Sequence, residues 1–117
     1  MMPPDLQRLQ HILDYCNEIE KTVERYGKNF EIFDQDADYQ RSIAFSILQI
    51  GALSGGLSEA YRISTADRMQ WGPMKGMRNM VAHHYGAMDR QMIWQTVMTD
   101  IPELKAFCME QIDLSKK

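Results

Sequence analysis

Apolar residues recur at three- and four-residue steps along much of the chain, which is the spacing of one face of an α-helix. The first stripe begins after Pro3-Pro4-Asp5 and ends before Gly27, and glycine commonly terminates helices. Its members are Leu6, Leu9, Ile12, Leu13, Cys16, Ile19, Val23 and Tyr26. The opposite face is rich in charged side chains. The pattern therefore predicts an amphipathic helix from Pro3 to Tyr26.

A second helix is predicted over residues 37–57, where apolar residues cover most of the circumference. Such a helix is expected to be central or to lie in a subunit interface. Residues 28–38 before it are predicted to be a connector. Asp34, Asp36 and Asp38 alternate there as in a calcium loop, but the glycine and the distal glutamate of such a loop are missing. We therefore expect one of these aspartates to cap the second helix.

The second half of the chain predicts shorter helices. Residues 58–70 are polar and less regular, with a helix-capping signal at Ser64-Thr65-Ala66-Asp67. A helix over residues 73–85 has a proline in its first turn and a glycine just past its end. Asp89 is expected to cap the next helix, and Asp100-Ile101-Pro102 to start the last. No segment alternates with a period of two, so the sequence predicts one all-α domain, 1–117, folded as a four- to five-helix up-and-down bundle.

Composition places this domain among ordinary proteins of the cytoplasm. No stretch approaches 18 apolar residues, so no membrane span is expected. The N-terminus has neither a basic start nor an apolar run, so no signal peptide is expected. Cys16 and Cys108 lie far apart and match no metal spacing. Because both fall in helical patterns, we expect two buried free thiols in a reducing compartment.

The charge of the chain is distributed unevenly. The net charge of −3 argues against a general nucleic-acid coat. Residues 1–61 carry five Lys or Arg against ten Asp or Glu, whereas residues 62–90 carry five basic residues against two acidic ones. The positive segment is thus the favoured place for an anionic ligand, although its cations can equally form a solvated surface.

This positive segment contains the richest cluster of chemical groups, Arg78 to Tyr85. On a helix, Asn79 and His83 fall on one face, and Arg78 and Tyr85 share a neighbouring face. A histidine can move a proton near neutral pH, and a guanidinium can neutralise charge on phosphate oxygens. The set therefore suits RNA cleavage by a ribose 2′-hydroxyl, without metal or other cofactor.

In this mechanism Asn79 orients the imidazole of His83, and Tyr85 stacks a base or bonds phosphate. One imidazole cannot easily make both proton transfers, so a dimer with two His83 across one cleft is sensible. The competing interpretation, equally supported by the chemistry, is a buried polar network that fixes a helix pairing. A zinc site is disfavoured because His83 and His84 diverge by roughly 100° on a helix. His84 alone is expected to be a surface or interface histidine.

The chain resembles the HepT-like toxins of the HEPN superfamily. Arg78-Asn79-Met80-Val81-Ala82-His83-His84-Tyr85 matches their pattern R-x-x-x-x-H-x-Y, with asparagine after the arginine. Further landmarks shared with that family are Leu9 to Tyr15, Phe33, Leu48-Gln49-Ile50-Gly51, Trp71, Trp94 and Asp100 to Leu104.

The resemblance implies an all-α, HEPN-like homodimeric ribonuclease that acts as the toxin of a toxin–antitoxin system. Arg78, His83 and Asn79 are then the catalytic residues, and Lys75, His84 and Tyr85 contact the RNA. The implied partner is an MntA-like nucleotidyltransferase antitoxin that transfers AMP to Tyr85.

One residue departs from the family pattern. Ala52 stands where the family commonly has glutamate, in Gly51-Ala52-Leu53. Because of this difference, the sequence also allows an alternative function, that of a non-catalytic helical module that binds a nucleotide or a nucleotidyltransferase.

Overall fold

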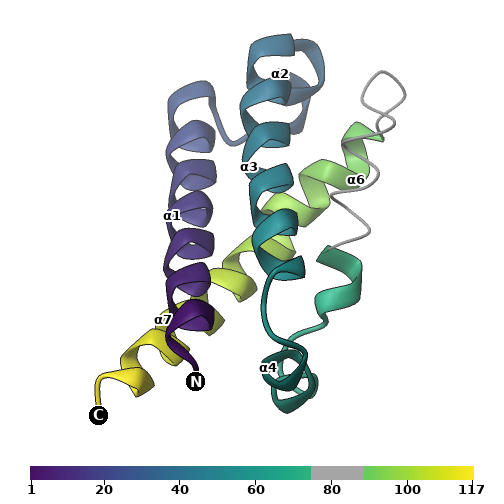
Figure 1. The fold of residues 1–117 in the computed structure, drawn as a ribbon. Helices are drawn as coiled ribbons and strands as arrows, with labels where there is room; N and C mark the ends of the chain where they lie inside the picture. The colour runs from purple at the N-terminus through teal and green to yellow at the C-terminus, as the bar shows by residue number, and fades with distance from the viewer. Residues whose placement is uncertain (75–88) are drawn as a thin grey trace.

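The computed structural model describes residues 1–74 and 89–117, and its elements there are helices without a β-strand among them. Two long helices, α1 (Pro3–Tyr26) and α3 (Ala37–Gly55), lie side by side and run antiparallel (Figure 1). Behind them, α6 (Arg90–Gln95), η2 (Thr96–Asp100) and α7 (Ile101–Ser115) form one continuous rod. The predicted all-α fold is confirmed.

Helix α1 follows its predicted boundaries closely. Its buried apolar side chains lie on the predicted stripe, and Leu9, Ile12 and Cys16 are fully covered. Gly27 ends the helix with φ of 120°, a value that favours glycine, and its N–H donates to the carbonyl of Val23.

The predicted connector between the long helices is partly wrong, because it contains the short helix α2 (Phe30–Gln35). The Asn29 side chain caps α2 by accepting hydrogen bonds from the N–H groups of Glu31 and Ile32. Asp36 caps α3 in the same way, accepting from the N–H groups of Asp38 and Tyr39 at 2.9 and 3.1 Å. The expectation that an aspartate caps this helix is therefore confirmed.

The helix α4 (Glu59–Ser64) begins at Ser58, not at the predicted Ser64–Asp67 signal. Ser58 caps α4 by accepting from the N–H of Tyr61, and its own N–H and hydroxyl donate to the buried carboxylate of Asp5 at 2.8 and 2.6 Å. Asp5 comes from the first turn of α1, 53 positions away. The start of α4 is therefore fixed by a local cap and also by a contact with a distant residue, which the local sequence does not reveal.

The predicted start of the last helix at Asp100-Ile101-Pro102 is confirmed, because α7 begins at Ile101, although the rod continues through this point without a break. In η2 the N–H of Ile101 donates to the carbonyl of Thr96, five residues back, as in a π-helix. Pro102 has no N–H, and its ring would collide with a carbonyl of a regular α-helix. The wider π turn accommodates the proline without a break, so α6 and α7 form a single support.

One buried core joins the long helices to the rod, and it includes both cysteines. Cys16 of α1 and Cys108 of α7 are buried free thiols, as predicted. Burial raises the pKa of Cys16 to about 12, and that of Cys108 also lies well above its ordinary value. Both thiols are therefore protonated and serve as packing groups. Among the described residues, no helix is long and apolar enough to cross a membrane.

Candidate functional site

The residues predicted to do the chemistry lie outside the described part of the chain. These are Lys75, Arg78, Asn79, His83, His84 and Tyr85. The structure describes the segments that flank residues 75–88, namely residues 58–74 before them and the start of α6 after them. We call these flanking segments and their contacts the frame.

Trp71 anchors the chain four residues before Lys75. Residues 71–74 are helical, and the Trp71 side chain is only 8% exposed. Its indole Nε1–H donates to the hydroxyl of Thr65 at 2.9 Å, in a buried hydrogen bond. Its ring meets the edge of Phe107 on α7, with centroids 5.6 Å apart. The entry to the predicted catalytic segment is thus fixed to the C-terminal rod.

A paired arginine strengthens this attachment. The guanidinium of Arg68 donates to both carboxylate oxygens of Glu110 on α7, at 2.8 and 2.6 Å. Its Cζ also lies 5.9 Å from the centre of the Phe107 ring. The hydrogen bond raises the pKa of Arg68 and lowers that of Glu110, so both stay charged at neutral pH. Two forked hydrogen bonds fix an orientation that a single contact would leave free.

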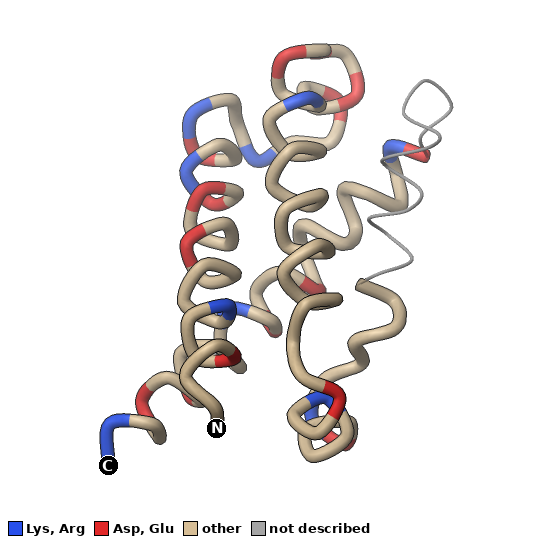
Figure 2. Tube along the Cα trace, in the orientation of Figure 1, with Lys and Arg blue, Asp and Glu red and all other residues tan. Residues whose placement is uncertain are grey.

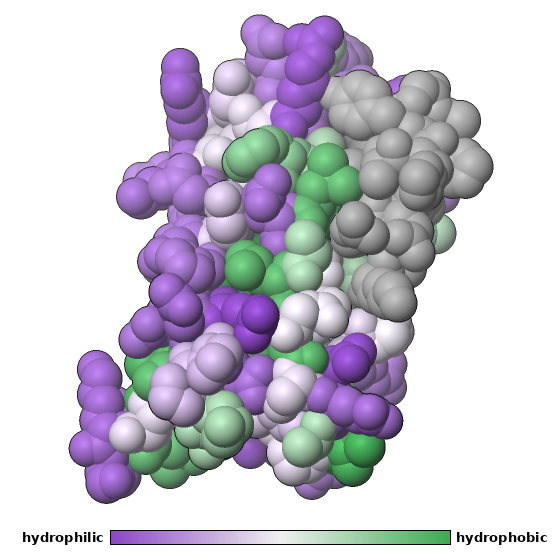
Figure 3. Space-filling model, in the orientation of Figure 1, coloured by the Kyte–Doolittle hydropathy of each residue, from purple (hydrophilic) through white to green (hydrophobic). Residues whose placement is uncertain are grey.

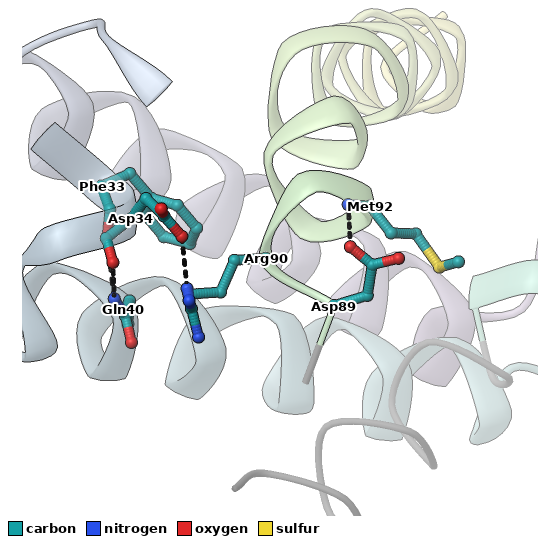
Figure 4. Close-up of polar contacts among 6 residues, drawn as sticks. All are labelled: Phe33, Asp34, Gln40, Asp89, Arg90 and Met92. Carbon is teal, nitrogen blue, oxygen red and sulfur yellow. Dashed lines mark hydrogen bonds and ion pairs between the residues drawn. The ribbon is translucent and has the colours of Figure 1, made fainter. Parts of the chain in front are cut away.

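The chain after residue 88 is attached at Asp89 and Arg90. The Asp89 carboxylate accepts from the N–H of Met92 at 3.1 Å and caps α6, as predicted. Arg90 donates to the carboxylate of Asp34 at the end of α2, at 2.5 Å (Figure 4). The Gln40 amide donates to the carbonyl of Phe33 in the same corner, so this part of α2 is itself held by α3.

Aromatic side chains also pack on the buried side of this corner, where α2, α3 and α6 meet. Trp94 of α6 lies against Phe30, Phe33 and Tyr39, with ring centroids 5.4 to 6.4 Å apart. The Tyr39 ring also stacks on Tyr26 at 4.8 Å, and its hydroxyl donates to the carbonyl of Gly27. The exit from the predicted catalytic segment is therefore fixed to α1, α2 and α3.

These pairings change the charge argument made from the sequence. Of the five basic residues in 62–90, Arg68 is neutralised by Glu110 and Arg90 by Asp34. Both acidic partners come from outside residues 62–90. The net positive charge around this segment in the folded structure is therefore smaller than the count along the sequence suggests. Figure 2 shows acidic positions gathered at the corner of α2 and α3. Arg62, Lys75 and Arg78 are thus the basic residues of this segment that still favour an anionic ligand.

Two of the five tyrosines are poorly suited to chemistry. Burial raises the pKa of both Tyr39 and Tyr61 to about 12. The Tyr61 hydroxyl donates to the side-chain oxygen of Gln111 at 2.9 Å, and that of Tyr39 is bonded to Gly27. Each phenol is thus protonated at neutral pH, and its hydroxyl makes a hydrogen bond that stabilises the fold.

Helix α3 has an apolar side that remains uncovered in the single chain. Phe45 is 55% exposed, and Figure 3 shows hydrophobic side chains along α3 beside the grey atoms. Ala52, the position where the family commonly has glutamate, is also exposed, whereas Gly51 beside it is buried. The exposed position means that a longer side chain at residue 52 would meet no packed core.

Sequence reasoning missed most of this frame. The contacts of Thr65, Arg68, Glu110 and Asp34 had no local signal, because their partners are six to 56 positions away. The sequence indicates Trp71 only as a residue shared with the HepT-like family, not as an anchor of the fold. In residues 1–74 and 89–117, no three His, Cys, Asp or Glu side chains gather as metal ligands would.

Comparison with known proteins identifies the family. The model of the family described as "Ribonuclease HepT-like" matches residues 12–111. A "Putative RNase" of Caldanaerobacter subterraneus subsp. tengcongensis is 30% identical over 108 residues, covering 92% of this chain and 94% of the relative. A "Probable ribonuclease HepT" of Thermococcus cleftensis is 28% identical over 97 residues, covering 79% of this chain and 87% of the relative. No solved structure matches the chain.

The family match covers most of the chain, including every residue of the predicted catalytic cluster. It confirms the resemblance to HepT-like proteins and the predicted enzyme class, a ribonuclease. The chain belongs to the family of HepT-like ribonucleases.

Proposed function

We propose that this HepT-like ribonuclease is the toxin of a two-gene toxin–antitoxin system and cuts RNA without a metal ion. The observation that carries the proposal is the ordered set Arg78, Asn79, His83 and Tyr85 inside the matched region 12–111. The anchors at Trp71 and Arg90 support it, since a catalytic segment needs firm attachment at both ends.

In the proposed reaction, the 2′-hydroxyl oxygen of a ribose attacks the adjacent phosphorus as His83 accepts the hydroxyl proton. The bond from phosphorus to the 5′ oxygen of the next nucleotide breaks, and that oxygen takes up a proton. The products are a 2′,3′-cyclic phosphate and a 5′-hydroxyl. Arg78 neutralises charge on the non-bridging oxygens, and Asn79 holds the imidazole of His83 in the required tautomer.

The two proton transfers are best divided between two imidazoles, and a homodimer supplies a second His83. The exposed Phe45 on the apolar side of α3 supports pairing, because a side chain of this size gains by being covered. We therefore propose that two chains share one RNA-binding cleft, with Lys75, His84 and Tyr85 contacting the substrate.

Neutralisation is proposed to occur at Tyr85. Its phenol oxygen attacks the α-phosphorus of ATP bound to an MntA-like nucleotidyltransferase, the bond to the β-phosphate breaks, and pyrophosphate leaves. The added phosphodiester is bulky and anionic, so it would block the phosphate site beside Arg78. The engagement of Tyr39 and Tyr61 in the fold supports the choice of Tyr85 as acceptor.

The cleavage proposal is tested with a labelled RNA in EDTA. We expect the wild type to cut it, and His83→Ala and Arg78→Ala each to lose about 100-fold or more of the rate. His11→Ala is the matched control, because His11 is an exposed histidine on α1 that lies 3.9 Å from Asp14. Equal cutting by wild type and His83→Ala would reject this role for His83.

The modification proposal is tested by mass spectrometry after co-expression with an MntA-like nucleotidyltransferase. We expect the mass of one AMP on Tyr85, its absence from Tyr85→Phe, and its retention in Tyr15→Phe. Modification on another residue would contradict the proposal. Modification of Tyr85 in a protein that never cuts RNA would favour the alternative, a non-catalytic module, which Ala52 at the family's glutamate position supports.

A further inference from the structure

A groove of about 610 Å³ lies between residues 66–74 and the rod formed by η2 and α7. Its apolar lining includes Met69 and Met74 on one wall and Ala106 and Phe107 on the other. The groove thus begins one residue before Lys75, beside the predicted catalytic segment, but it is built entirely from described residues.

The rim of the groove is acidic. Asp67 lies on one wall, and Asp100, Glu103 and Glu110 lie on the rod. The spacing of Asp100, Glu103, Phe107 and Glu110 places them on one face of a helix. Arg68 is the basic residue of the lining, and its two hydrogen bonds to Glu110 cancel that pair of charges. Asp67, Asp100 and Glu103 therefore leave the groove with a charge of about −3.

An acidic rim around an apolar floor selects against RNA and in favour of basic peptide. Phosphates that entered the groove would meet three like charges. A lysine or arginine side chain has the opposite character, with an apolar stem that can lie on methionine and alanine and a cationic head that can reach carboxylates. Alternating basic and apolar residues would fill both parts of the groove at once.

We propose that this groove, bounded by Asp67, Asp100 and Glu103, docks a basic segment of a partner protein in which Lys or Arg alternates with apolar residues. The proposal goes beyond the proposed cleavage of RNA and does not depend on it. A partner held here would contact Met74, which directly precedes the predicted catalytic segment in the chain.

Fluorescence anisotropy with a labelled ten-residue peptide of alternating lysine and leucine tests this directly. The double variant Asp100→Asn/Glu103→Gln should bind it about fivefold or more weakly than wild type, since two ion pairs are lost. The matched control is Glu24→Gln/Asp113→Asn, which removes the same charge from exposed positions away from the groove lining. It should change binding less than about twofold. Equal weakening by both double variants would overturn the proposal, because net charge alone would explain it.

A second variant separates the groove from general electrostatics. Ala106→Arg places a bulky cation on the groove wall, at an exposed helical position where folding should be unaffected. We expect it to abolish peptide binding with an unchanged melting temperature, and an unlabelled single-stranded RNA of ten nucleotides not to displace the peptide from wild type. Peptide binding that survives Ala106→Arg, or displacement by the RNA, would show that the groove is not a peptide dock. RNA cleavage by Asp100→Asn/Glu103→Gln should match wild type, so failure of this inference and failure of the proposed function give different results.

Discussion

Replacing Trp71 with phenylalanine should reduce RNA cleavage by more than the loss of stability can explain. The change removes the buried hydrogen bond from indole Nε1 to the Thr65 hydroxyl, which is 2.9 Å long and contributes about 1 kcal/mol. The smaller ring also loses contact area against Phe107, for about another 1 kcal/mol. The Thr65 hydroxyl keeps its own donation to the carbonyl of Tyr61, so no buried donor is left without a partner.

A loss of about 2 kcal/mol leaves a domain of ordinary stability almost fully folded at 25 °C. Displacement of a catalytic group by about 1 Å, by contrast, can cost up to 100-fold in rate. We therefore expect the cleavage rate of Trp71→Phe to fall by about tenfold or more at 25 °C, because this anchor fixes the chain just before Lys75.

The matched control is the double variant Ile12→Val/Ile43→Val. Both isoleucines are fully buried in the helices α1 and α3, and each substitution costs about 1 kcal/mol. Urea unfolding would establish that the control and Trp71→Phe are equally destabilised. If the two then cut RNA at the same rate, Trp71 contributes only stability and its positioning role is refuted.

Three further changes test other parts of the structure. Asp5 is buried, which by itself would raise its pKa, but hydrogen bonds from the hydroxyl and N–H of Ser58 outweigh this and lower it. Its stabilisation should therefore be present above the ordinary carboxyl pKa of about 4 and lost as the pH falls through the lower folded value, so Asp5→Asn should lose stability at pH 7 and show a smaller decline in acid unfolding curves. Gly27→Ala should cost about 1 to 3 kcal/mol in urea unfolding, because φ is 120° and the new Cβ would lie 3.0 Å from Cδ1 of Ile32; no loss would show that the turn relaxes. Ala52→Glu should change stability by less than about 0.5 kcal/mol at this exposed position and raise the cleavage rate, whereas a lower rate would contradict a supporting role for a carboxylate there.

The features that the sequence predicted are those with local causes. The stripe of α1 appears in its spacing, and Asp36 caps α3 through the nearby N–H groups of Asp38 and Tyr39. The two cysteines lie on apolar faces and are buried as such faces require. In each case the residues that fix the outcome are neighbours in the chain, so the pattern contains the information.

The features that the sequence did not predict depend on distant partners. Ser58, the cap of α4, is held by hydrogen bonds that it donates to Asp5, 53 positions away, although Ser64–Asp67 carried the more familiar capping pattern. The π turn of η2 keeps the rod intact at Pro102, where a proline usually signals a new helix. Arg68 and Arg90 were counted as free charge, but Glu110 and Asp34 neutralise them from 42 and 56 positions away. The family was recognisable from residues 78–85, whereas the frame that holds them was not.

The most direct test of the central claim, that His83 drives metal-independent cleavage, is to identify the ends of the cut RNA. Purified wild-type protein in excess EDTA should leave a 2′,3′-cyclic phosphate on one fragment and a 5′-hydroxyl on the next. His11→Ala should give the same ends, and His83→Ala should give none. Cleavage that stops in EDTA, or fragments that carry a 5′-phosphate, would contradict attack by the 2′-hydroxyl and with it the role assigned to His83.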